Sequence, residues 1–543
     1  MASVNVQPSL EDVQKIIDSG KKLDHPPTLI PICASVSSEF LTPSSIYLKI
    51  SANAKSKLSF LFESAATTET IARYSFIGAD PHKTLVSGPD HGLEADPLPR
   101  LAEELAQHRL ASVPSLRLPP MAGGAIGYVG YDCVKYFEPK TKREMKDVLK
   151  VPESLFMLFD TIVAQDHFSQ RAMVITYLHV PDPDALKTSL EAAYETCRKT
   201  IASYIRILQS PDLPLPPQGP IKLKQEYSSN IGQPGYESHV NTLKKHIVSG
   251  DIIQAVPSQR IARPTSLHPF NIYRHLRTVN PSPYLFYISC EDFHIVGASP
   301  ELLVKSETNG RIITHPIAGT VKRGPTPAED EALATTLRES LKDRAEHVML
   351  VDLARNDVNR VCDPLTTRVD KLMVVQKFSH VQHLVSEVSG ILRPGKTRFD
   401  AFRSIFPAGT VSGAPKVRAM ELIAELEREK RGVYAGAVGY FGYDTVDPQT
   451  GVGAEGAMDT CIALRTMMVK DGIAYLQAGG GIVFDSDPTE EYEETMNKAA
   501  ANMRCIEQAE RLHYEEQQQN GLPAMVEGNS QPIGPGKVSL AAG

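Results

Sequence analysis

Two stretches of the chain place acidic side chains one helical turn apart. Glu491 and Glu494 are followed by Lys498 at positions i, i+3 and i+7, and Asp343 and Glu346 repeat the i, i+3 spacing. Residues with this spacing share one face of a helix. Carboxylate oxygens suit Mg²⁺, which usually takes one or two of them together with water and substrate oxygens. The two stretches therefore fit a shared cation site, although two solvated helix faces would show the same spacing.

A second group of residues could bind an anion. The backbone N–H groups of Gly479–Gly481 follow an apolar segment and could line an anion-binding concavity or simply form a tight turn. Arg465 lies in an apolar segment, where a guanidinium must find a partner or reach a cavity. Gly319 and the Thr320 hydroxyl follow another strand-like segment, and His383 lies where a core histidine is the ordinary interpretation. A carboxylate ligand would satisfy Arg465.

The composition limits the class of protein that carries these residues. The 543 residues are 42% hydrophobic and 22% charged, as in soluble globular proteins with two domains or one large elaborated one. A net charge of -7 without a dense basic stripe predicts no nucleic-acid partner. Seven scattered cysteines without CxxC spacing favour a reducing compartment. Because the chain shows no signal-peptide pattern and no apolar run of about 18 residues, we expect no membrane span and a cytoplasmic location.

The elements that must position these residues are predicted from periodicity. Residues 191–209 and 236–254 have apolar residues at helical spacing, as do the two acidic stretches. Short β-branched and aromatic segments without regular βαβ spacing predict an α+β fold with large, mainly antiparallel sheets and helices packed outside. Several prolines within residues 210–222 fix an extended backbone, which predicts a linker there. The expected organisation is an N-terminal segment (1–28), an N-terminal domain (29–209), the linker (210–222), a second domain (223–511) and a disordered polar tail (512–543).

One nine-residue pattern occurs twice. GAIGYVGYD at 124–132 matches GAVGYFGYD at 436–444 in seven of nine positions. The glycine spacing differs from the dinucleotide-binding pattern, and no helix-like segment opens from it. We expect two equivalent strands in two related sheets, with glycines where backbones approach closely.

A series of motifs gives the chain a specific resemblance. In chain order these are GDIIQAVPSQR, NPSPYLFYI, VGASPELLV, HPIAGTVKRG, KDRAEHVMLVDLARND, FPAGTVSGAPKVRAM, GAVGYFGYD, CIALRT and DSDPTEEYEET. They resemble the chorismate-utilising enzymes and, among these, anthranilate synthase component I. The resemblance is dense over residues 235–505 and thinner before them, where it rests on LFESA (61–65) and RYSFIG (73–78).

The resemblance implies that Mg²⁺ binds the ring carboxylate of chorismate. Glu346 and Glu494 match the direct metal ligands, and Asp343 and Glu491 match acids that act through water. Chorismate is a dianion, and an acidic site would repel it without a cation. The charge balance therefore also requires Mg²⁺.

The resemblance also implies the residues that bind and convert the substrate. Glu301 matches the acid that protonates the leaving hydroxyl, and His383 matches the residue implicated in the later loss of pyruvate. The resemblance also implies a catalytic role for Thr320. The implied substrate-binding residues are Gly319, Thr320, Tyr440, Arg465, Gly479, Gly480, Gly481 and Lys498.

Two positions distinguish reactions within the family. Isochorismate and salicylate synthases have a water-activating lysine where this chain has Gln254, so ammonia is favoured over water as nucleophile. Many aminodeoxychorismate synthases have a nucleophilic lysine where this chain has Ala318. We therefore expect conversion of chorismate and ammonia into anthranilate and pyruvate, the first step of tryptophan biosynthesis. The alternatives are an aminodeoxychorismate synthase and a catalytically silent tryptophan-sensing binding module.

The resemblance further implies a partner and a regulator. The chain has no segment resembling the nucleophile region of a glutamine amidotransferase, so ammonia is expected from a separate amidotransferase subunit. LFESA resembles a feedback element for L-tryptophan, although Phe62 stands where leucine is commoner. The implied tryptophan-binding residues are Glu63, Ser64, Pro283, Tyr284 and Leu285. The chain itself contains no tryptophan, as suits an enzyme translated during tryptophan shortage.

Overall fold

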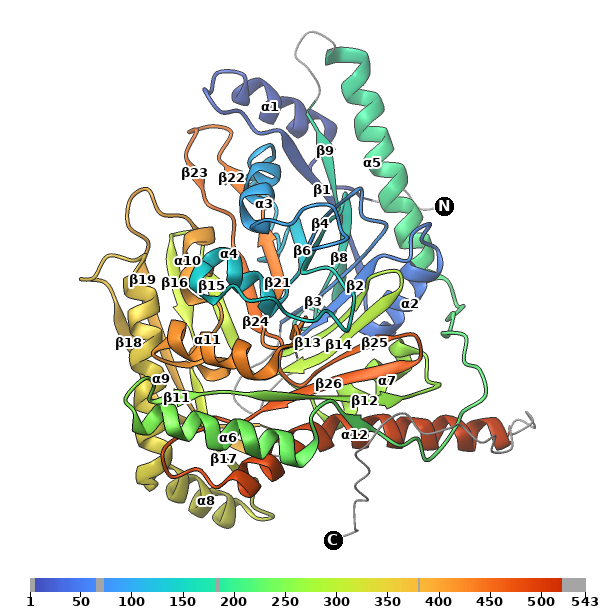
Figure 1. Cartoon of the computed structure of the whole chain (residues 1–543). Coiled ribbons are helices and arrows are strands. Elements are labelled where there is room, and N and C mark those ends of the chain that lie inside the picture. The colour runs from blue at the N-terminus through green and yellow to red at the C-terminus, as the bar shows by residue number, and fades with distance from the viewer. Residues whose placement is uncertain (1–4, 65–72, 181–185, 379–380, 520–543) are drawn as a thin grey trace.

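Two large β-sheets with helices outside them form the computed structural model, which describes residues 5–64, 73–180, 186–378 and 381–519 (Figure 1). Among the described residues, the long strands pair antiparallel, and the short strand β5 pairs parallel with β1 and β22. The predicted α+β class with large, mainly antiparallel sheets is confirmed. No described helix is long and apolar enough to cross a membrane.

The larger sheet has 14 strands within the described residues. Its spatial order is β10 (Ser228–Ser229), β12 (Ser258–Pro264), β26 (Ile473–Gly479), β25 (Thr466–Lys470), β14 (Phe293–Ser299), β13 (Tyr284–Ser289), β2 (Ser59–Glu63), β3 (Tyr74–Ala79), β8 (Thr161–Asp166), β9 (Arg171–His179), β1 (Leu29–Ser37), β5 (Arg109–Ala111), β22 (Asp444–Val446) and β23 (Gly453–Ala454).

The smaller sheet has ten strands within the described residues, nine of them in one path and β18 (Arg368–Lys377) paired to β19 off that path. Its members include β17 (Ile317–Lys322), β19 (Val381–Ile391), β16 (Arg311–Thr314), β15 (Leu302–Ser306), β24 (Met458–Ile462), β21 (Ala437–Gly442), β6 (Gly124–Val129), β7 (Ser154–Leu158) and β4 (Lys83–Ser87). A separate two-stranded sheet pairs β11 (Gln254–Ala255) with β20 (Gly413–Ala414).

The helices lie outside the sheets, as Figure 1 shows. They are α1 (Leu10–Gly20), α2 (Pro43–Ala52), α3 (Pro97–Ala106), α4 (Val134–Phe137), α5 (Leu186–Gln209), α6 (Gly232–Val248), α7 (Pro269–Val279), α8 (Pro327–Glu339), α9 (Leu341–Asn359), α10 (Arg398–Ile405), α11 (Lys416–Glu427) and α12 (Pro488–Gln519). The helices predicted at both acidic stretches are confirmed as α9 and α12. Asp487 caps α12 by accepting hydrogen bonds from the N–H groups of Thr489 and Glu490.

The parts of the chain before and after residues 210–222, here called the two half-chains, share one strand order. From the β2–β13 junction outwards, the larger sheet runs β2, β3, β8, β9, β1 on one side and β13, β14, β25, β26, β12 on the other. In the smaller sheet, β6, β7, β4 correspond to β21, β24, β15. The half-chains therefore have the same core topology and join through β2–β13 and β5–β22 in the larger sheet and through β6–β21 in the smaller one. The division into domains at 210–222 remains a prediction.

The two copies of the nine-residue pattern lie side by side. β6 and β21 are antiparallel neighbours with Gly127 opposite Gly439, so the expectation of strands in two different sheets is wrong. A Cβ on Gly127 would overlap the carbonyl oxygen of Leu155, and one on Gly439 would overlap that of Asp459. Close backbone approach at the glycines is therefore confirmed.

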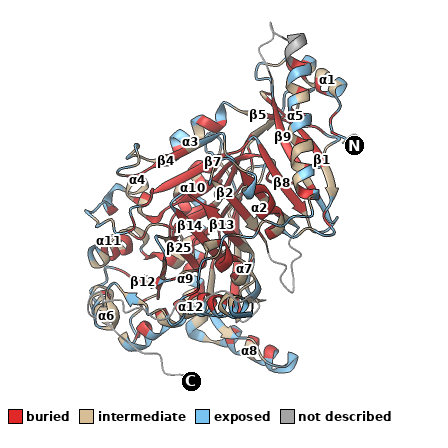
Figure 2. Cartoon of the chain, turned by 90° about the vertical axis from the view of Figure 1, so that its right-hand side faces the viewer, coloured by how far each residue is buried: buried red, intermediate tan, exposed pale blue. Residues whose placement is uncertain are grey.

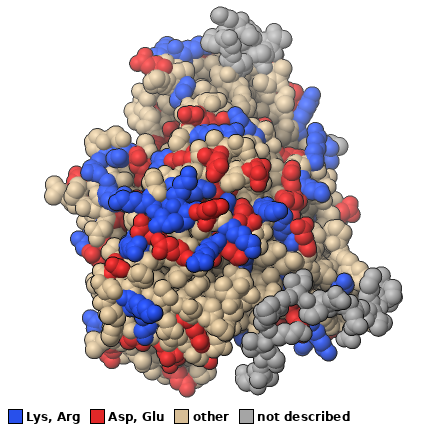
Figure 3. All heavy atoms as spheres, viewed as in Figure 1, with Lys and Arg blue, Asp and Glu red and all other residues tan. Residues whose placement is uncertain are grey.

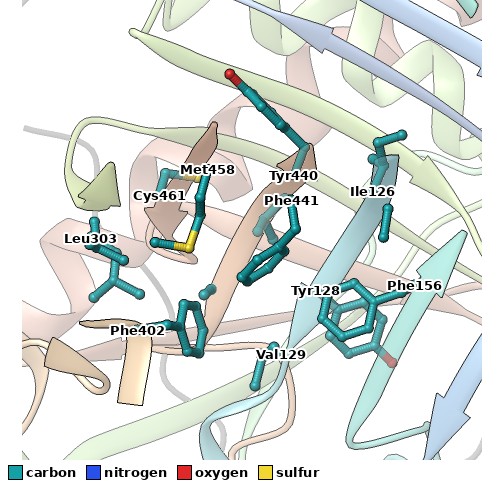
Figure 4. Close-up of a cluster of buried hydrophobic side chains, with 14 of the residues drawn as sticks. Ile126, Tyr128, Val129, Phe156, Leu303, Phe402, Tyr440, Phe441, Met458 and Cys461 are labelled. Atoms are coloured by element: carbon teal, nitrogen blue, oxygen red, sulfur yellow. The ribbon is translucent and has the colours of Figure 1, made fainter. Parts of the chain in front are cut away.

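Buried residues are concentrated on the strands of the sheets (Figure 2). Phe441 on β21 stacks on Phe399 at a ring-centroid distance of 5.5 Å and meets the edge of Phe156 at 5.7 Å. Figure 4 shows Tyr440 pointing to the opposite side of β21 from Phe441. This alternation separates a hydrophobic face of the strand from one that carries a buried hydroxyl.

The end of α12 corrects the predicted tail. Residues 512–519 continue the helix, because the sequence up to Gln519 contains helix-forming Glu and Gln and no Gly or Pro. The remainder of the expected tail, 520–543, lies outside the described residues. On the face shown in Figure 3, basic and acidic side chains are interspersed rather than sorted by sign.

Candidate active site

Glu301 is a buried carboxylic acid in the turn between β14 and β15. The Oε1 of Glu301 accepts a hydrogen bond of 3.0 Å from the Thr410 hydroxyl, and Glu301 is 4% exposed. Burial raises the pKa of Glu301 to about 8, against smaller lowering effects of Thr410, the Ile317 backbone and the Arg465 charge. Glu301 is thus mainly protonated at neutral pH and can donate a proton.

Arg465 lies between β24 and β25 and faces this acid. Its φ of 50° is left-handed, a strained conformation for a non-glycine residue that is common at functional sites. Burial lowers the pKa of Arg465, while the nearby Tyr434, Glu301 and Glu494 raise it. A partly buried guanidinium without a direct carboxylate partner among the described residues is suited to bind a carboxylate ligand.

His383 on β19 meets the Gly319–Thr320 segment of β17. Its Nδ1 lies 2.9 Å from the Gly319 carbonyl oxygen and 3.0 Å from the Thr320 hydroxyl. Because a carbonyl only accepts, Nδ1 carries the proton and Nε2 is left with a lone pair. Burial lowers the pKa of His383 to about 4, so the ring is neutral near pH 7 and can act as a base.

Helix α9 supplies the first pair of acids. Glu346 is half-buried, and its Oε1 lies 3.4 Å from Nε2 of Gln254. Burial raises the pKa of Glu346, Lys498 and Gln254 lower it, and the charges of Glu494 and Asp343 raise it again. The acids from α9 and α12 are therefore close enough to influence one another.

Helix α12 supplies the second pair. Glu494 is half-exposed and pairs with Lys498 at 2.5 Å, and Lys498 also donates to the Gly479 carbonyl at 2.9 Å. Glu491 is buried and accepts from Ser486 at 2.6 Å through Oε1, whereas its buried Oε2 has no hydrogen-bond partner in the described part of the chain. Burial raises the pKa of Glu491. This buried oxygen is therefore suited to accept from a cationic or proton-donating ligand.

The residues fit a hard cation by donor type. They offer carboxylate oxygens from Glu346 and Glu494, and a buried carboxylate at Glu491. No group of three or more His, Cys, Asp or Glu side chains is arranged to hold a metal within the described ranges. Mg²⁺ needs only one or two protein carboxylates when substrate and water supply the other ligands.

The glycines after β26 bring backbone close to these side chains. A Cβ on Gly480 would lie 2.7 Å from Oε2 of Glu491, and one on Gly481 would overlap the Gln254 amide. Two of the three N–H groups already have protein acceptors: Gly480 donates to the Tyr236 hydroxyl at 3.0 Å, and Gly479 bonds to Tyr434. Only the Gly481 N–H is left without a protein acceptor among the described contacts.

Tyr440 does not join this cluster. Its ring lies 6.4 Å from that of Phe76, and its neighbouring charges are those of Asp459 and Tyr284. Tyr434 instead lies beside Arg465 and bonds to Gly479. Tyr434 lies two residues before the GAVGYFGYD motif and Tyr440 lies within it on β21, where its ring is directed towards Phe76 of the larger sheet.

The site residues expected from the sequence do not include two polar side chains found here, those of Tyr434 and Thr410. Thr410 lies inside a motif that carries the resemblance and Tyr434 lies two residues before another, but spacing alone does not show which hydroxyl reaches Glu301 or Arg465. The other predicted residues form one series of neighbours: Gly319 lies against Asp343, Gly481 against Glu346, and Gly480 against Glu491.

The expected tryptophan residues meet across the β2–β13 pair, where Glu63 is opposite Leu285. The Glu63 carboxylate accepts from the Tyr273 hydroxyl at 2.6 Å and from Arg277 at 3.0 Å. Tyr284 donates to Asp459 at 3.1 Å. Pro283 and Ser64 are half-buried, and residues 65–72 of the same segment lie outside the described ranges.

The fold and the acid-rich site define a class, that of the chorismate binding enzymes. The model of this family matches residues 57–504, and the chain belongs to the family. It is 60% identical over 516 residues to anthranilate synthase component 1 of Saccharomyces cerevisiae, covering 94% of this chain and 98% of that protein. It is 55% identical over 514 residues to a probable anthranilate synthase component 1 of Schizosaccharomyces pombe, covering 95% and 99%.

Solved structures show the same fold. Anthranilate synthase component I from Streptococcus pneumoniae TIGR4 matches with a TM-score of 0.65 and 37% identity, covering 80% of this chain and 94% of that one. The menaquinone-specific isochorismate synthase from Escherichia coli matches with a TM-score of 0.66 at 18% identity, covering 92% and 98%, which shows the fold alone.

Proposed function

We propose that the chain converts chorismate and ammonia into anthranilate and pyruvate, the first step of tryptophan biosynthesis. The observation that carries the proposal is a buried, protonated Glu301 close to the partly buried guanidinium of Arg465. A proton donor beside a carboxylate anchor is what amination at a ring carbon with loss of a ring hydroxyl requires when the substrate carries a ring carboxylate.

The chain's own residues divide the two chemical steps between them. Arg465 and Tyr434 hold a substrate carboxylate, while ammonia adds at ring carbon 2. Glu301 gives its proton to the hydroxyl that leaves from ring carbon 4. His383, neutral and with Nε2 unprotonated, then takes the proton from carbon 2 as pyruvate is eliminated. The Thr320 hydroxyl and Gly319 carbonyl keep the His383 ring in that orientation.

The choice of ammonia over water follows from two neutral side chains. Gln254 is an amide beside Glu346 and cannot deprotonate a water molecule. Ala318 on β17 offers no amine to form a covalent adduct. Neutral ammonia is a better nucleophile than neutral water and attacks without prior deprotonation, so it needs neither group.

Mg²⁺ is the proposed cofactor. Glu346 and Glu494 would hold it directly, and Asp343 and Glu491 would act through water. When bound, the ion neutralises a carboxylate of the substrate that these acids would otherwise repel. The orphaned Glu491 oxygen and the raised pKa values of Glu346 and Glu491 support a cation at this place.

Ammonia is proposed to come from a separate glutamine amidotransferase subunit. The relatives' name, component 1, supports a second component. L-tryptophan is the proposed feedback inhibitor, bound by Glu63, Ser64, Pro283, Tyr284 and Leu285, and the β2–β13 pairing of Glu63 with Leu285 supports a single site. Tyr440 and Asp459 border the same space. A cytoplasmic location is proposed from the cysteine usage.

The test is an assay of the isolated chain with chorismate, an ammonium salt and MgCl₂. Fluorescent anthranilate together with pyruvate supports the proposal. Formation of aminodeoxychorismate, which keeps the pyruvyl ether, would replace it by the alternative synthase. No product, with tryptophan binding intact, would favour the silent sensing module.

A further inference from the structure

A buried serine ties together the two segments that carry the proton donor and the anion anchor. Ser299, the last residue of β14, is fully buried. Its hydroxyl donates to the Ile462 carbonyl at 2.6 Å and accepts from the Glu301 N–H at 3.3 Å. The Ile462 N–H in turn donates to the Glu301 carbonyl at 3.0 Å.

This geometry fixes the backbone of Glu301 relative to that of Arg465. Ile462 ends β24 only three residues before Arg465, and the Arg465 carbonyl accepts from the Ala298 N–H at 3.3 Å. One hydroxyl therefore bridges the turn that carries the acid and the strand end that carries the guanidinium. Because the bridge is buried, water cannot replace it without a cost.

The same serine is bonded to the proposed tryptophan element. The hydroxyl of Ser282, the residue before Pro283, donates to the Ser299 carbonyl at 2.5 Å, and Ser282 is buried. Tyr284 and Ser299 are also opposite each other in the β13–β14 pair. A displacement of the Pro283–Tyr284 backbone is thus transmitted to Ser299 through a hydrogen bond and a strand pair.

We propose that Ser299 is a positioning residue for Glu301, and that Ser282 couples tryptophan occupancy to this position. The inference rests on the proposed function and names how its regulation reaches the acid. Tryptophan seated against Pro283 and Tyr284 shifts Ser282, the Ser299 bridge loosens, and Glu301 leaves its place opposite Arg465. Inhibition then lowers turnover without occupying the chorismate site.

The test compares Ser299→Ala and Ser282→Ala with Ser306→Ala. Ser306 is a matched control, because its hydroxyl on β15 is buried and has no protein partner in the described structure. Ser299→Ala is expected to lower kcat at least tenfold with a KM for chorismate within about threefold. The alkaline fall of kcat is also expected at lower pH, because a displaced Glu301 is better solvated. Ser306→Ala should match wild type.

The coupling of tryptophan binding to Glu301 through Ser282 is measured separately. Since the chain has no tryptophan, bound L-tryptophan is the only indole and its binding is measured by its own fluorescence. Ser282→Ala is expected to bind tryptophan within about twofold of wild type but to retain at least fivefold more activity at saturating tryptophan.

Each outcome decides one step. If wild type makes no anthranilate, the proposed function fails before the variants are compared. If wild type is active and Ser299→Ala keeps its kcat and pH profile, the positioning role is refuted. A Ser299→Ala chain that does not fold, judged by circular dichroism, leaves Ser282→Ala to decide: unchanged residual activity at saturating tryptophan would overturn the proposal.

Discussion

Replacing Glu301 by Gln removes the proton donor with little change of volume. The carboxyl has an ordinary pKa of 4.5 and is raised to about 8 by burial. At pH 7 a group with a pKa of about 8 is roughly 90% protonated, whereas an ordinary one would be about 0.3% protonated. Burial therefore increases the donor population about 300-fold.

The expected loss of activity follows from this role. A positioned general acid contributes about 10²- to 10⁴-fold, so kcat of Glu301→Gln should fall by that factor, or about 2.7 to 5.5 kcal/mol of barrier. The wild-type kcat should decrease as the pH rises through about 8, because the ionised form cannot donate. The variant should be slow and nearly independent of pH in this range.

Thr410→Val supplies a directional control. The Thr410 hydroxyl donates to the carboxylate and lowers its pKa, so its removal should raise the pKa of Glu301 and move the alkaline fall of kcat to higher pH. Anthranilate fluorescence with a saturating ammonium salt measures all three proteins, with total ammonia adjusted so that NH₃ is constant across the pH series. A Glu301→Gln variant within threefold of wild type, or a shift of Thr410→Val to lower pH, would refute the assignment.

Three further changes test other parts of the site. Glu494→Ala should lower Mg²⁺-dependent turnover more than tenfold, over about 1.4 kcal/mol of barrier, and raise the Mg²⁺ concentration for half activity; equal titration curves would exclude Glu494 as a ligand. Tyr434→Phe should raise the KM for chorismate several-fold while Tyr440→Phe leaves it unchanged, and the reverse result would restore Tyr440 to the substrate site. Gly439→Ala should lower the melting temperature by several degrees or prevent folding, because its Cβ would overlap the Asp459 carbonyl; a wild-type melting curve would contradict this packing.

The parts of the fold that local patterns specify were predictable. Helices α9 and α12 follow from their periodicity. Strand β26, which ends at Gly479, follows from its β-branched and aromatic residues. The polar composition after residue 511 predicts an irregular tail, but α12 continues to Gln519 because Glu and Gln favour helix.

The pairing of distant strands was not predictable in the same way. The repeat around Gly127 and Gly439 indicated two equivalent strands, but nothing local to either strand shows that they are neighbours in one sheet. The same limit applies to the site. The resemblance implied Glu301, and the apolar segment around Arg465 indicated that its guanidinium needs a partner. The choice between Tyr434 and Tyr440 instead depends on how the turn before β21 and the strand itself direct each side chain.

The joining of the half-chains through β2–β13 and β6–β21 has a consequence for how the molecule unfolds. Cutting the chain near residue 215 would leave each fragment with these two strand edges open in the middle of what were continuous sheets, and would also open the β5–β22 pair of the larger sheet. Such edges invite association with other chains. Separately expressed fragments should therefore aggregate alone and recover when produced together, and the intact protein should melt in one cooperative transition rather than two.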